Sequence, residues 1–203
     1  MYILGINGSH RAGKGTSLLL RAALDAAVGA GAQTELVELS ALDIGYCAGC
    51  NACLARTTCA LSDDMDALVE KMRSADGILL GSPVYFGNVT ARMKTFIDRT
   101  RPLHMAENAL AGKVGGAVVT AGLPDCGAEG TLAVLDAFFA THEMIAVHPR
   151  PAGPVLRGGV IATQLAGFSE GGRPCWQSTK DDQVALKFAA QLGRDVARLI
   201  VRA

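Results

Sequence analysis

Short apolar runs alternate with amphipathic segments along the whole chain. The apolar runs have the length and flanking residues of buried strands, and they occupy residues 2–7, 33–39, 77–81, 113–121 and 144–147. Between them, apolar side chains recur at helical spacing, as in Leu20, Leu24 and Val28. Helical spacing and capping residues predict helices over residues 16–28, 62–73, 90–99, 129–141 and 180–201.

This alternation predicts a doubly wound α/β domain with a five-stranded parallel sheet, because strands that are apolar on both faces need helices on both sides. No linker divides the sequence, so we expect a single domain over residues 1–203. Residues 149–178 are rich in proline and glycine and are expected to form an irregular excursion before the last helix. Ligands of such sheets bind beyond the carboxyl ends of the strands, here in the loops after the first, third and fourth strands.

Composition narrows the class of protein. Half of the 203 residues are hydrophobic, which is enough for a sizeable core, and the formal net charge of zero argues against a nucleic-acid-binding protein. No apolar run has the length of a membrane span, and the first residues do not resemble a secretion signal. We therefore expect a cytoplasmic protein, in which six cysteines do not form a disulfide framework.

The loop after the first strand, GSHRAGKGTS at residues 8–17, is close to a P-loop. Gly15, however, stands where the P-loop pattern has the hydroxyl that binds magnesium. Backbone N–H groups at the start of a helix favour a phosphate. The side chains that add hydroxyl groups or positive charge are Ser9, Arg11, Lys14, Thr16 and Ser17. These residues predict a phosphate site, with a plain glycine-rich turn as the alternative, and they leave open which phosphate compound binds.

The loops after the third and fourth strands suit a flat ligand. Tyr85 and Phe86 place two aromatic rings at the mouth of the sheet, and Gly87 and Asn88 leave backbone and amide groups free to reach a planar ring. The small residues of 120–122 allow a ligand to approach the backbone closely. Taken alone, each loop is equally consistent with ordinary core or surface residues.

Four cysteines form a compact run, Cys47, Cys50, Cys53 and Cys59, within a cysteine segment at residues 43–62. The first three share the spacing of bacterial ferredoxin ligands, whereas zinc sites more often separate two such pairs by a longer insert. The run therefore favours a [4Fe–4S] cluster over zinc, and four reduced thiols without a metal are the alternative.

Together, the motifs G-S-x-R…T-S, S-P-V-Y-F-G-N-V and T-x-G…G-x-E resemble the flavodoxin-like NAD(P)H-dependent flavin reductases across most of the chain. The resemblance implies a flavodoxin-like fold and the phosphate of FMN in the first loop, which needs no magnesium hydroxyl at Gly15. It implies that the FMN phosphate is held by Ser9, Arg11, Gly15, Thr16 and Ser17. It also implies that the isoalloxazine ring is held by Pro83, Val84, Tyr85, Phe86, Gly87 and Asn88, with Thr120, Ala121 and Gly122 along its edge.

Within that family, the cysteine run after the second strand is similar to that of the iron–sulfur flavoproteins. This likeness implies an FMN-dependent oxidoreductase that also carries a [4Fe–4S] cluster on Cys47, Cys50, Cys53 and Cys59. It would couple a two-electron partner such as NAD(P)H to a one-electron, ferredoxin-like partner, as a homo-oligomer (a dimer or a tetramer). No side chain is assigned as a catalytic acid or base. Three alternatives stay open: an NAD(P)H-dependent FMN or quinone reductase without a cluster, a non-enzymatic electron carrier or redox sensor, and an ATP-binding kinase.

Overall fold

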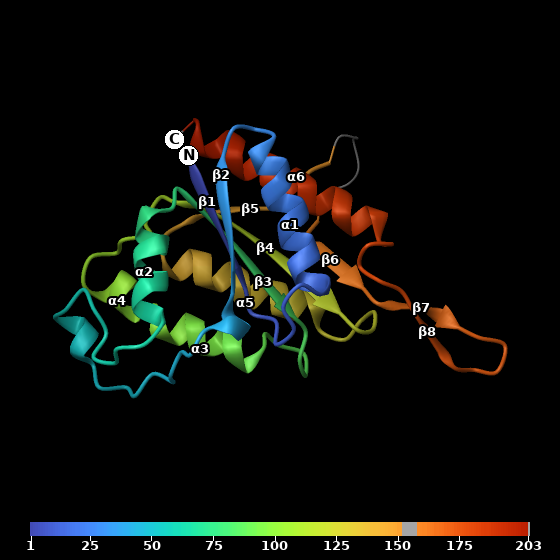
Figure 1. Ribbon diagram of the computed structural model, residues 1–203, viewed down its shortest axis with the longest axis horizontal. Helices are drawn as coiled ribbons and strands as arrows, with labels where there is room; N and C mark the ends of the chain where they lie inside the picture. The colour runs from blue at the N-terminus through green and yellow to red at the C-terminus, as the bar shows by residue number, and fades with distance from the viewer. Residues whose placement is uncertain (152–157, 203) are drawn as a thin grey trace.

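The computed structural model describes residues 1–151 and 158–202 and shows a central parallel sheet (Figure 1). Its main strands are β1 (Tyr2–Asn7), β2 (Gln33–Glu38), β3 (Gly77–Pro83), β4 (Val114–Ala121) and β5 (Ile145–Val147). They lie in the order β2-β1-β3-β4-β5, which is the flavodoxin-like order. The predicted doubly wound α/β fold with five parallel strands is confirmed.

The strand position beside β4 is shared by two short strands. β5 pairs with the first half of β4, with Val114 opposite Ile145, and β6 (Val160–Thr163) pairs with the second half, with Val118 opposite Val160. Both pairings are parallel. β5 and β6 therefore lie along the same edge of β4, and the residues after β6 come to the carboxyl end of β4.

The prediction that residues 149–178 are irregular is wrong for much of their described part. Besides β6, this part contains an antiparallel hairpin of β7 (Leu165–Phe168) and β8 (Pro174–Trp176), which projects from the body (Figure 1). Residues 152–157 of the segment lie outside the described residues. Strands of three or four residues are too short to show alternation, and Gly167 and Pro174 read as breakers.

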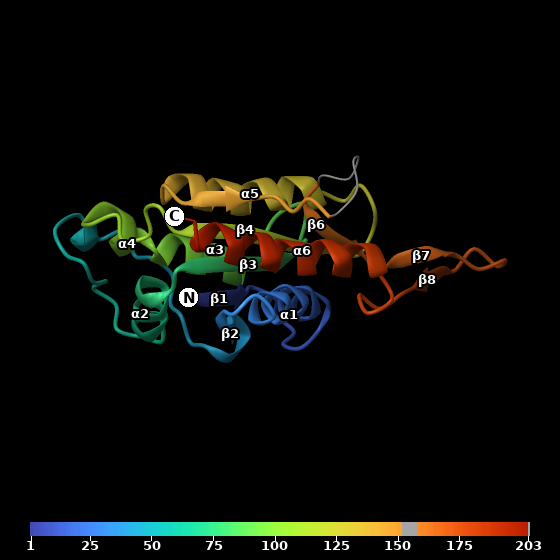
Figure 2. The same ribbon diagram turned by 90° about the horizontal axis from the view of Figure 1, so that it is seen from above.

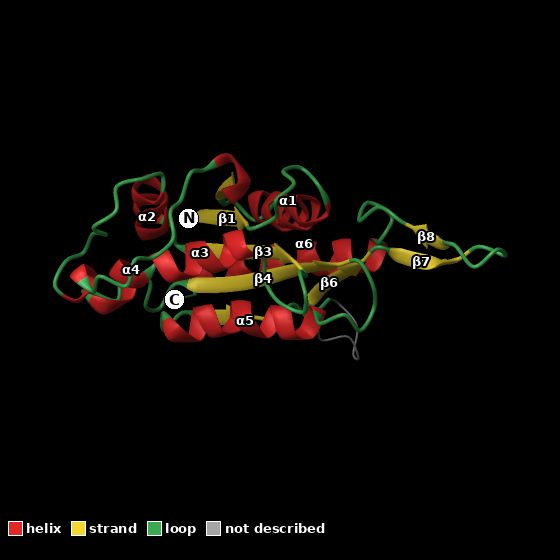
Figure 3. Ribbon diagram, turned by 90° about the horizontal axis from the view of Figure 1, so that it is seen from below, coloured by secondary structure: helices red, strands yellow, loops and turns green. Residues whose placement is uncertain are grey.

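Two groups of helices cover the two faces of the sheet (Figures 2 and 3). One face packs against α1 (Gly15–Val28) and α6 (Gln183–Ile200), and the other against α2 (Met65–Ser74), α3 (Ala91–Arg99), α4 (Arg101–Met105) and α5 (Ala128–Thr141). The predicted helices begin and end within three residues of the observed ones, and α4 was not expected. One single turn of 3₁₀ helix, Leu39–Ala41, lies just before the cysteine segment, and a second, Ala52–Leu54, lies in the middle of it.

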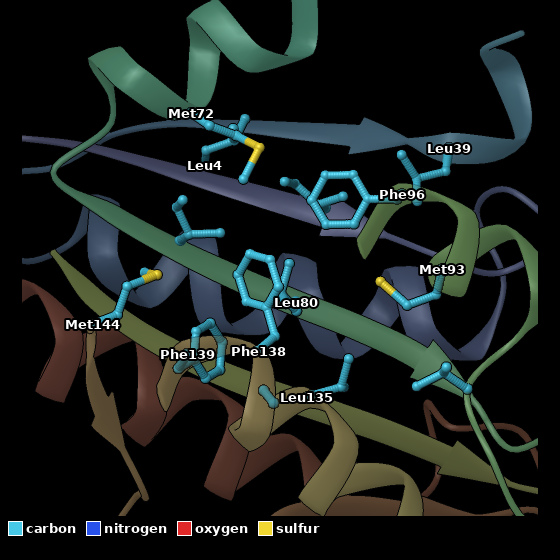
Figure 4. Close-up of a cluster of buried hydrophobic side chains, with 14 of the residues drawn as sticks. Leu4, Leu39, Met72, Leu80, Met93, Phe96, Leu135, Phe138, Phe139 and Met144 are labelled. Carbon is cyan, nitrogen blue, oxygen red and sulfur yellow. The ribbon is translucent and has the colours of Figure 1, made fainter. Parts of the chain in front are cut away.

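Each face of the sheet has its own hydrophobic core. On the face of α2, α3 and α5, the side chains of Met72, Phe96 and Phe138 pack over β1 and β3 (Figure 4). On the opposite face, α1 and α6 approach so closely that a Cβ at Gly193 would overlap the carbonyl oxygen of Ala23. Among the described residues, no helix has both the length and the apolar character to cross a membrane.

A buried histidine lies where α5 ends against α4. His142 is only 3% exposed; its Nε2 lies 3.0 Å from the hydroxyl of Thr100, and its Nδ1 has no partner among the described residues. Burial, together with the nearby His104, lowers the pKa of His142 to about 4. The imidazole is therefore neutral in the folded protein near neutral pH.

We predict that His142 makes the fold acid-sensitive. Its pKa is lower in the folded protein than in the unfolded chain, so its contribution to stability is full above about pH 6.5 and is lost as the pH falls toward 4. Urea unfolding at about pH 7.5 and about pH 5 is expected to show that the wild type loses on the order of 2 kcal/mol more than His142→Gln. Equal losses in the two proteins would contradict this account.

Candidate functional site

The three loops singled out in the sequence meet at the carboxyl end of the sheet. The N–H of Gly8 donates to the carbonyl of Gly81 at 2.8 Å, which joins the loop after β1 to β3. The hydroxyl of Thr90, the N-cap of α3, donates to the carbonyl of Gly8 at 2.6 Å. The hydroxyls of Thr16 and Thr120 lie 2.8 Å apart, which joins the start of α1 to β4. Hydrogen bonds therefore connect the three loops to one another at this end of the sheet.

Asn7, the last residue of β1, holds the first loop from within. It is fully buried; its Nδ2 donates to Ser17 Oγ at 2.8 Å and to Glu38 Oε2 at 2.6 Å. Its Oδ1 accepts from the N–H of Ser9 at 3.0 Å. The Ser9 hydroxyl in turn accepts from the N–H of Arg11 at 3.1 Å. One amide side chain thus fixes both ends of the predicted phosphate loop.

The start of α1 remains open to a ligand. Its N-cap residue, Lys14, makes no side-chain capping bond, and the first N–H groups of any helix have no partner within the helix. A Cβ at Gly15 would lie 2.6 Å from Thr179 Oγ1, so any larger residue there would displace the Thr179 side chain. The Thr179 hydroxyl is buried and has no partner within the described part of the chain. Unpaired N–H groups, hydroxyls and two nearby cations fit an anionic group such as a phosphate.

The predicted phosphate residues differ in how accessible they are. Arg11 is exposed, Gly15 is partly exposed, and Ser9 and Thr16 are buried. Ser17 is fully buried and accepts a hydrogen bond from Asn7. Direct contact of each of these five residues with a phosphate stays a prediction.

Residues 85–88 form a tight turn that presents the two aromatic side chains. Tyr85 and Asn88 exchange backbone hydrogen bonds of 2.8 and 3.1 Å, while Phe86 and Gly87 between them have φ values of 49° and 74°. The side chains of Tyr85 and Phe86 are exposed, whereas Pro83 and Val84, where the turn leaves β3, are partly buried. The turn therefore holds its aromatic side chains away from the core, where a ligand can reach them.

The loop after β4 supports this turn. The N–H of Val84 donates to the carbonyl of Thr120 at 2.8 Å. Ala121 is buried and Gly122 is exposed, and the carbonyls of both accept N–H groups from the β6–β7 connection. Further on, Gly127 has a φ of 97°, and a Cβ there would lie 2.6 Å from the Cα of Gly87. The turn at residues 85–88 can adopt its shape only because glycine occupies position 127.

A cavity of about 380 Å³ adjoins the first loop, on the side of α3 and of the segment after β2. His10, Asp43, Tyr46, Arg92 and Thr95 line it together with apolar residues. The ring of His10 also contacts Tyr85, with centroids 5.2 Å apart. The cavity thus includes His10, which contacts the aromatic turn, and it also reaches Tyr46, next to Cys47.

The four clustered cysteines line one small cavity. Cys47, Cys50, Cys53 and Cys59 surround a space of about 20 Å³, together with Arg99, Arg101 and Pro102. Within the described residues, no three Cys, His, Asp or Glu side chains are grouped tightly enough to hold a single metal ion. A [4Fe–4S] cluster sets a different requirement, because each of its four thiolates binds a different iron. Four thiols around one cavity, each free of a disulfide, fit such a cluster in ligand type and number.

Arg99, the last residue of α3, holds this segment in place. Its side chain is fully buried and donates to Asp63 twice, at 2.6 and 3.0 Å, and to the carbonyl of Gly45 at 2.7 Å. Asp63 also accepts from the N–H groups of Gly45 and Met65, and its hydrogen bonds with Arg99 hold its pKa below the usual range. Burial lowers the pKa of Arg99, but hydrogen bonds and charge from Asp63 and Cys59 outweigh this effect, so the pKa is raised overall. Both partners therefore stay charged.

Helix α3 connects the two sites. Its N-cap Thr90 contacts the first loop, and its last residue Arg99 lines the cysteine cavity. Nine residues of α-helix span about 13 Å. Figure 1 shows α3 running from the loop after β3 toward the cysteine segment, which lies at the end of the molecule opposite the β7–β8 hairpin. The fold thus sets the two sites about one short helix apart.

The sequence did not single out several residues that build these sites. Asn7, Glu38 and Thr179 shape the first loop, and Arg99 and Asp63 hold the cysteine segment. Asn7 could have been identified from the sequence, because it is a polar residue at the end of an otherwise apolar strand. The Arg99–Asp63 pair could not, because 36 residues separate the partners.

Comparison with known proteins finds related sequences and a similar fold. A family model described as NADPH-dependent FMN reductase matches residues 1–152. An iron–sulfur flavoprotein of Methanocaldococcus jannaschii is 38% identical over 200 residues, covering 98% of this chain and 97% of its own length. One from Archaeoglobus fulgidus is 34% identical over 199 residues, covering 98% and 95%. The structure of FerB, an NAD(P)H:(acceptor) oxidoreductase of Paracoccus denitrificans, aligns with a TM-score of 0.67 at 18% identity, covering 99% and 97%.

We predict that Gly127→Ala disturbs the aromatic turn. Backbone strain of about 1–3 kcal/mol and the clash with Gly87 are expected to move the turn and to raise the Kd for FMN at least about tenfold. The matched control is Gly130→Ala, because a Cβ there lies at an ordinary 3.7 Å from the carbonyl oxygen of Gly87. Fluorescence titration with FMN gives the Kd of both variants. Wild-type affinity in Gly127→Ala would contradict the proposed location of the ring.

Proposed function

Since the chain belongs to the NADPH-dependent FMN reductase family, we propose that it passes electrons between a two-electron partner and a one-electron partner. It is a flavin-dependent oxidoreductase, and its curated relatives at 38% and 34% identity are named iron–sulfur flavoproteins. The observation that carries the finer proposal is the cavity shared by Cys47, Cys50, Cys53 and Cys59, one short helix from the flavin loops.

The protein's part in this function is to bind and orient two cofactors. FMN can exchange two electrons at once or one at a time, whereas a [4Fe–4S] cluster exchanges one, and the protein supplies position and electrostatics. Ser9, Arg11, Gly15, Thr16 and Ser17 would bind the FMN phosphate. The turn from Pro83 to Asn88 would hold the ring, with Thr120, Ala121 and Gly122 at its edge. The thiolates of Cys47, Cys50, Cys53 and Cys59 would bind the irons.

We further propose the partners that this arrangement requires. NAD(P)H is the candidate two-electron donor, and the cavity beside His10 and Tyr85 has the size of a small-molecule site. A ferredoxin-like protein is the candidate one-electron partner, since Cys47 and Cys50 are exposed at the surface. We also propose a homo-oligomer and a cytoplasmic location, where the thiols stay reduced.

A second candidate function is that of an NAD(P)H-dependent FMN or quinone reductase with no cluster. The match of residues 1–152 to a family described as NADPH-dependent FMN reductase favours it, because that description names FMN and no cluster. It predicts bound flavin and quinone reduction that do not depend on the cysteine run.

Substitution of one thiol separates the two functions. Cys53 is the most buried of the four cysteines, and we expect Cys53→Ala to keep FMN and NAD(P)H:quinone turnover. The turnover of Cys53→Ala with a ferredoxin should fall at least about tenfold. Substituting even a residue that only supports a metal ligand typically lowers activity by about that factor or more. Cys175→Ala is the matched control, since Cys175 is an exposed thiol on the β7–β8 hairpin outside the run.

Steady-state rates with both acceptors, measured without oxygen, decide between the two functions. A selective loss of ferredoxin reduction in Cys53→Ala, with Cys175→Ala unaffected, supports the proposed function. Ferredoxin reduction at the wild-type rate in Cys53→Ala would overturn it in favour of the reductase without a cluster.

A further inference from the structure

Arg99 is a buried cation beside four thiols, and one of its three nitrogens, Nε, has no partner within the described residues. It is 1% exposed and the largest of the fully buried side chains. Its two terminal nitrogens bond to Asp63 and to the carbonyl of Gly45. Its Nε is buried without a partner within the described residues. An unpaired N–H of a charged group in the interior is costly unless an acceptor is bound there.

The acceptor is indicated by what lines the same cavity. Arg99 shares that cavity with Cys47, Cys50, Cys53 and Cys59. Thiolates and cluster sulfides accept hydrogen bonds, and such bonds are among the factors that set the reduction potential of an iron–sulfur cluster.

The same residue also closes the cysteine segment at both ends. Gly45 comes two residues before Cys47, and Asp63 comes four residues after Cys59. Arg99 bonds to both, and Gly45 and Asp63 bond to each other at 2.9 Å. The guanidinium is therefore held in one position by two anchors that the cysteine segment itself provides.

We propose that Arg99 raises the reduction potential of the cluster held by the four cysteines, an inference that rests on the proposed function. When the cluster is reduced, one electron from the two-electron partner adds one negative charge, and no bond forms or breaks. A fixed positive charge in the interior stabilises the reduced form more than the oxidised form, because the interior screens charge weakly. The Nε–H donor adds to this effect, since a hydrogen bond to sulfur strengthens as negative charge builds up.

Arg101 provides a matched comparison within the same cavity. It lines the cavity as Arg99 does, but it is partly exposed and bonds only weakly, to Asn51 Oδ1 at 3.2 Å. Water and salt screen a charge in that position. Two arginines beside the same thiols therefore differ mainly in burial and fixation, and the structure assigns the main effect on the potential to Arg99.

The test is a dye-mediated redox titration, followed by electron paramagnetic resonance, of holoprotein purified without oxygen. We expect Arg99→Met, at wild-type iron and sulfide content, to shift the reduction equilibrium at least tenfold toward the oxidised form, which is about 59 mV for one electron. Arg101→Met should shift it less, and added salt should diminish the Arg101 effect while leaving the Arg99 effect unchanged. An unchanged potential in cluster-bearing Arg99→Met would overturn the proposal.

A second variant decides the matter if Arg99→Met does not hold the cluster. Arg99→Gln removes the charge but keeps an amide group that can bond to Asp63 or to the carbonyl of Gly45. A lowered cluster potential in Arg99→Gln supports the proposal, and an unchanged one overturns it. A wild-type protein without iron would overturn the proposed function, whereas an iron-bearing wild type with an unshifted Arg99 variant overturns this inference alone.

Discussion

The structure depends on how helix α3 is fixed at its two ends. At its start, the Thr90 hydroxyl accepts from the N–H of Met93 and donates to the carbonyl of Gly8, so a single side chain caps the helix and holds the loop after β1. At its end, Arg99 is buried against Asp63. Removing one partner of a buried ion pair typically costs roughly 3–5 kcal/mol, because the other charge is left without compensation. Because α3 is anchored at both ends, it keeps the loop after β1 and the cysteine segment at a fixed distance from each other.

This constraint explains why the fold suits two cofactors. The carboxyl end of a parallel sheet already provides open helix N-termini and short loops, which favour a phosphate and a flat ring. The cysteine segment adds a second site without altering the sheet, because it is inserted between β2 and α2. Arg99 attaches this segment to the end of α3, Arg73 of α2 donates to the carbonyl of Thr57 at 2.8 Å, and the flanks of the segment bond to each other. A flavin site and a thiol site can thus share one domain.

Much of this architecture follows from the sequence, for identifiable reasons. Buried parallel strands give continuous apolar runs, and the helices between them give regular spacing, so both were predicted closely. The hairpin at 165–176 was missed because its strands are short and contain glycine and proline. Arg99 was unremarkable in sequence, because its importance comes from burial and from partners that are distant along the chain. Asn7 and Thr179 act through contacts that only the folded chain brings together.

The most direct test of the central claim, that one domain holds both a flavin and a cluster, is the cofactor content of protein purified without oxygen. Flavin, iron and acid-labile sulfide should be measured on the same sample, together with its visible absorption spectrum. The account predicts one FMN with about four irons and four sulfides per chain, as a four-cysteine cluster requires. Flavin without iron would contradict the cluster and leave an FMN reductase, and protein that binds neither cofactor after reconstitution would contradict both sites.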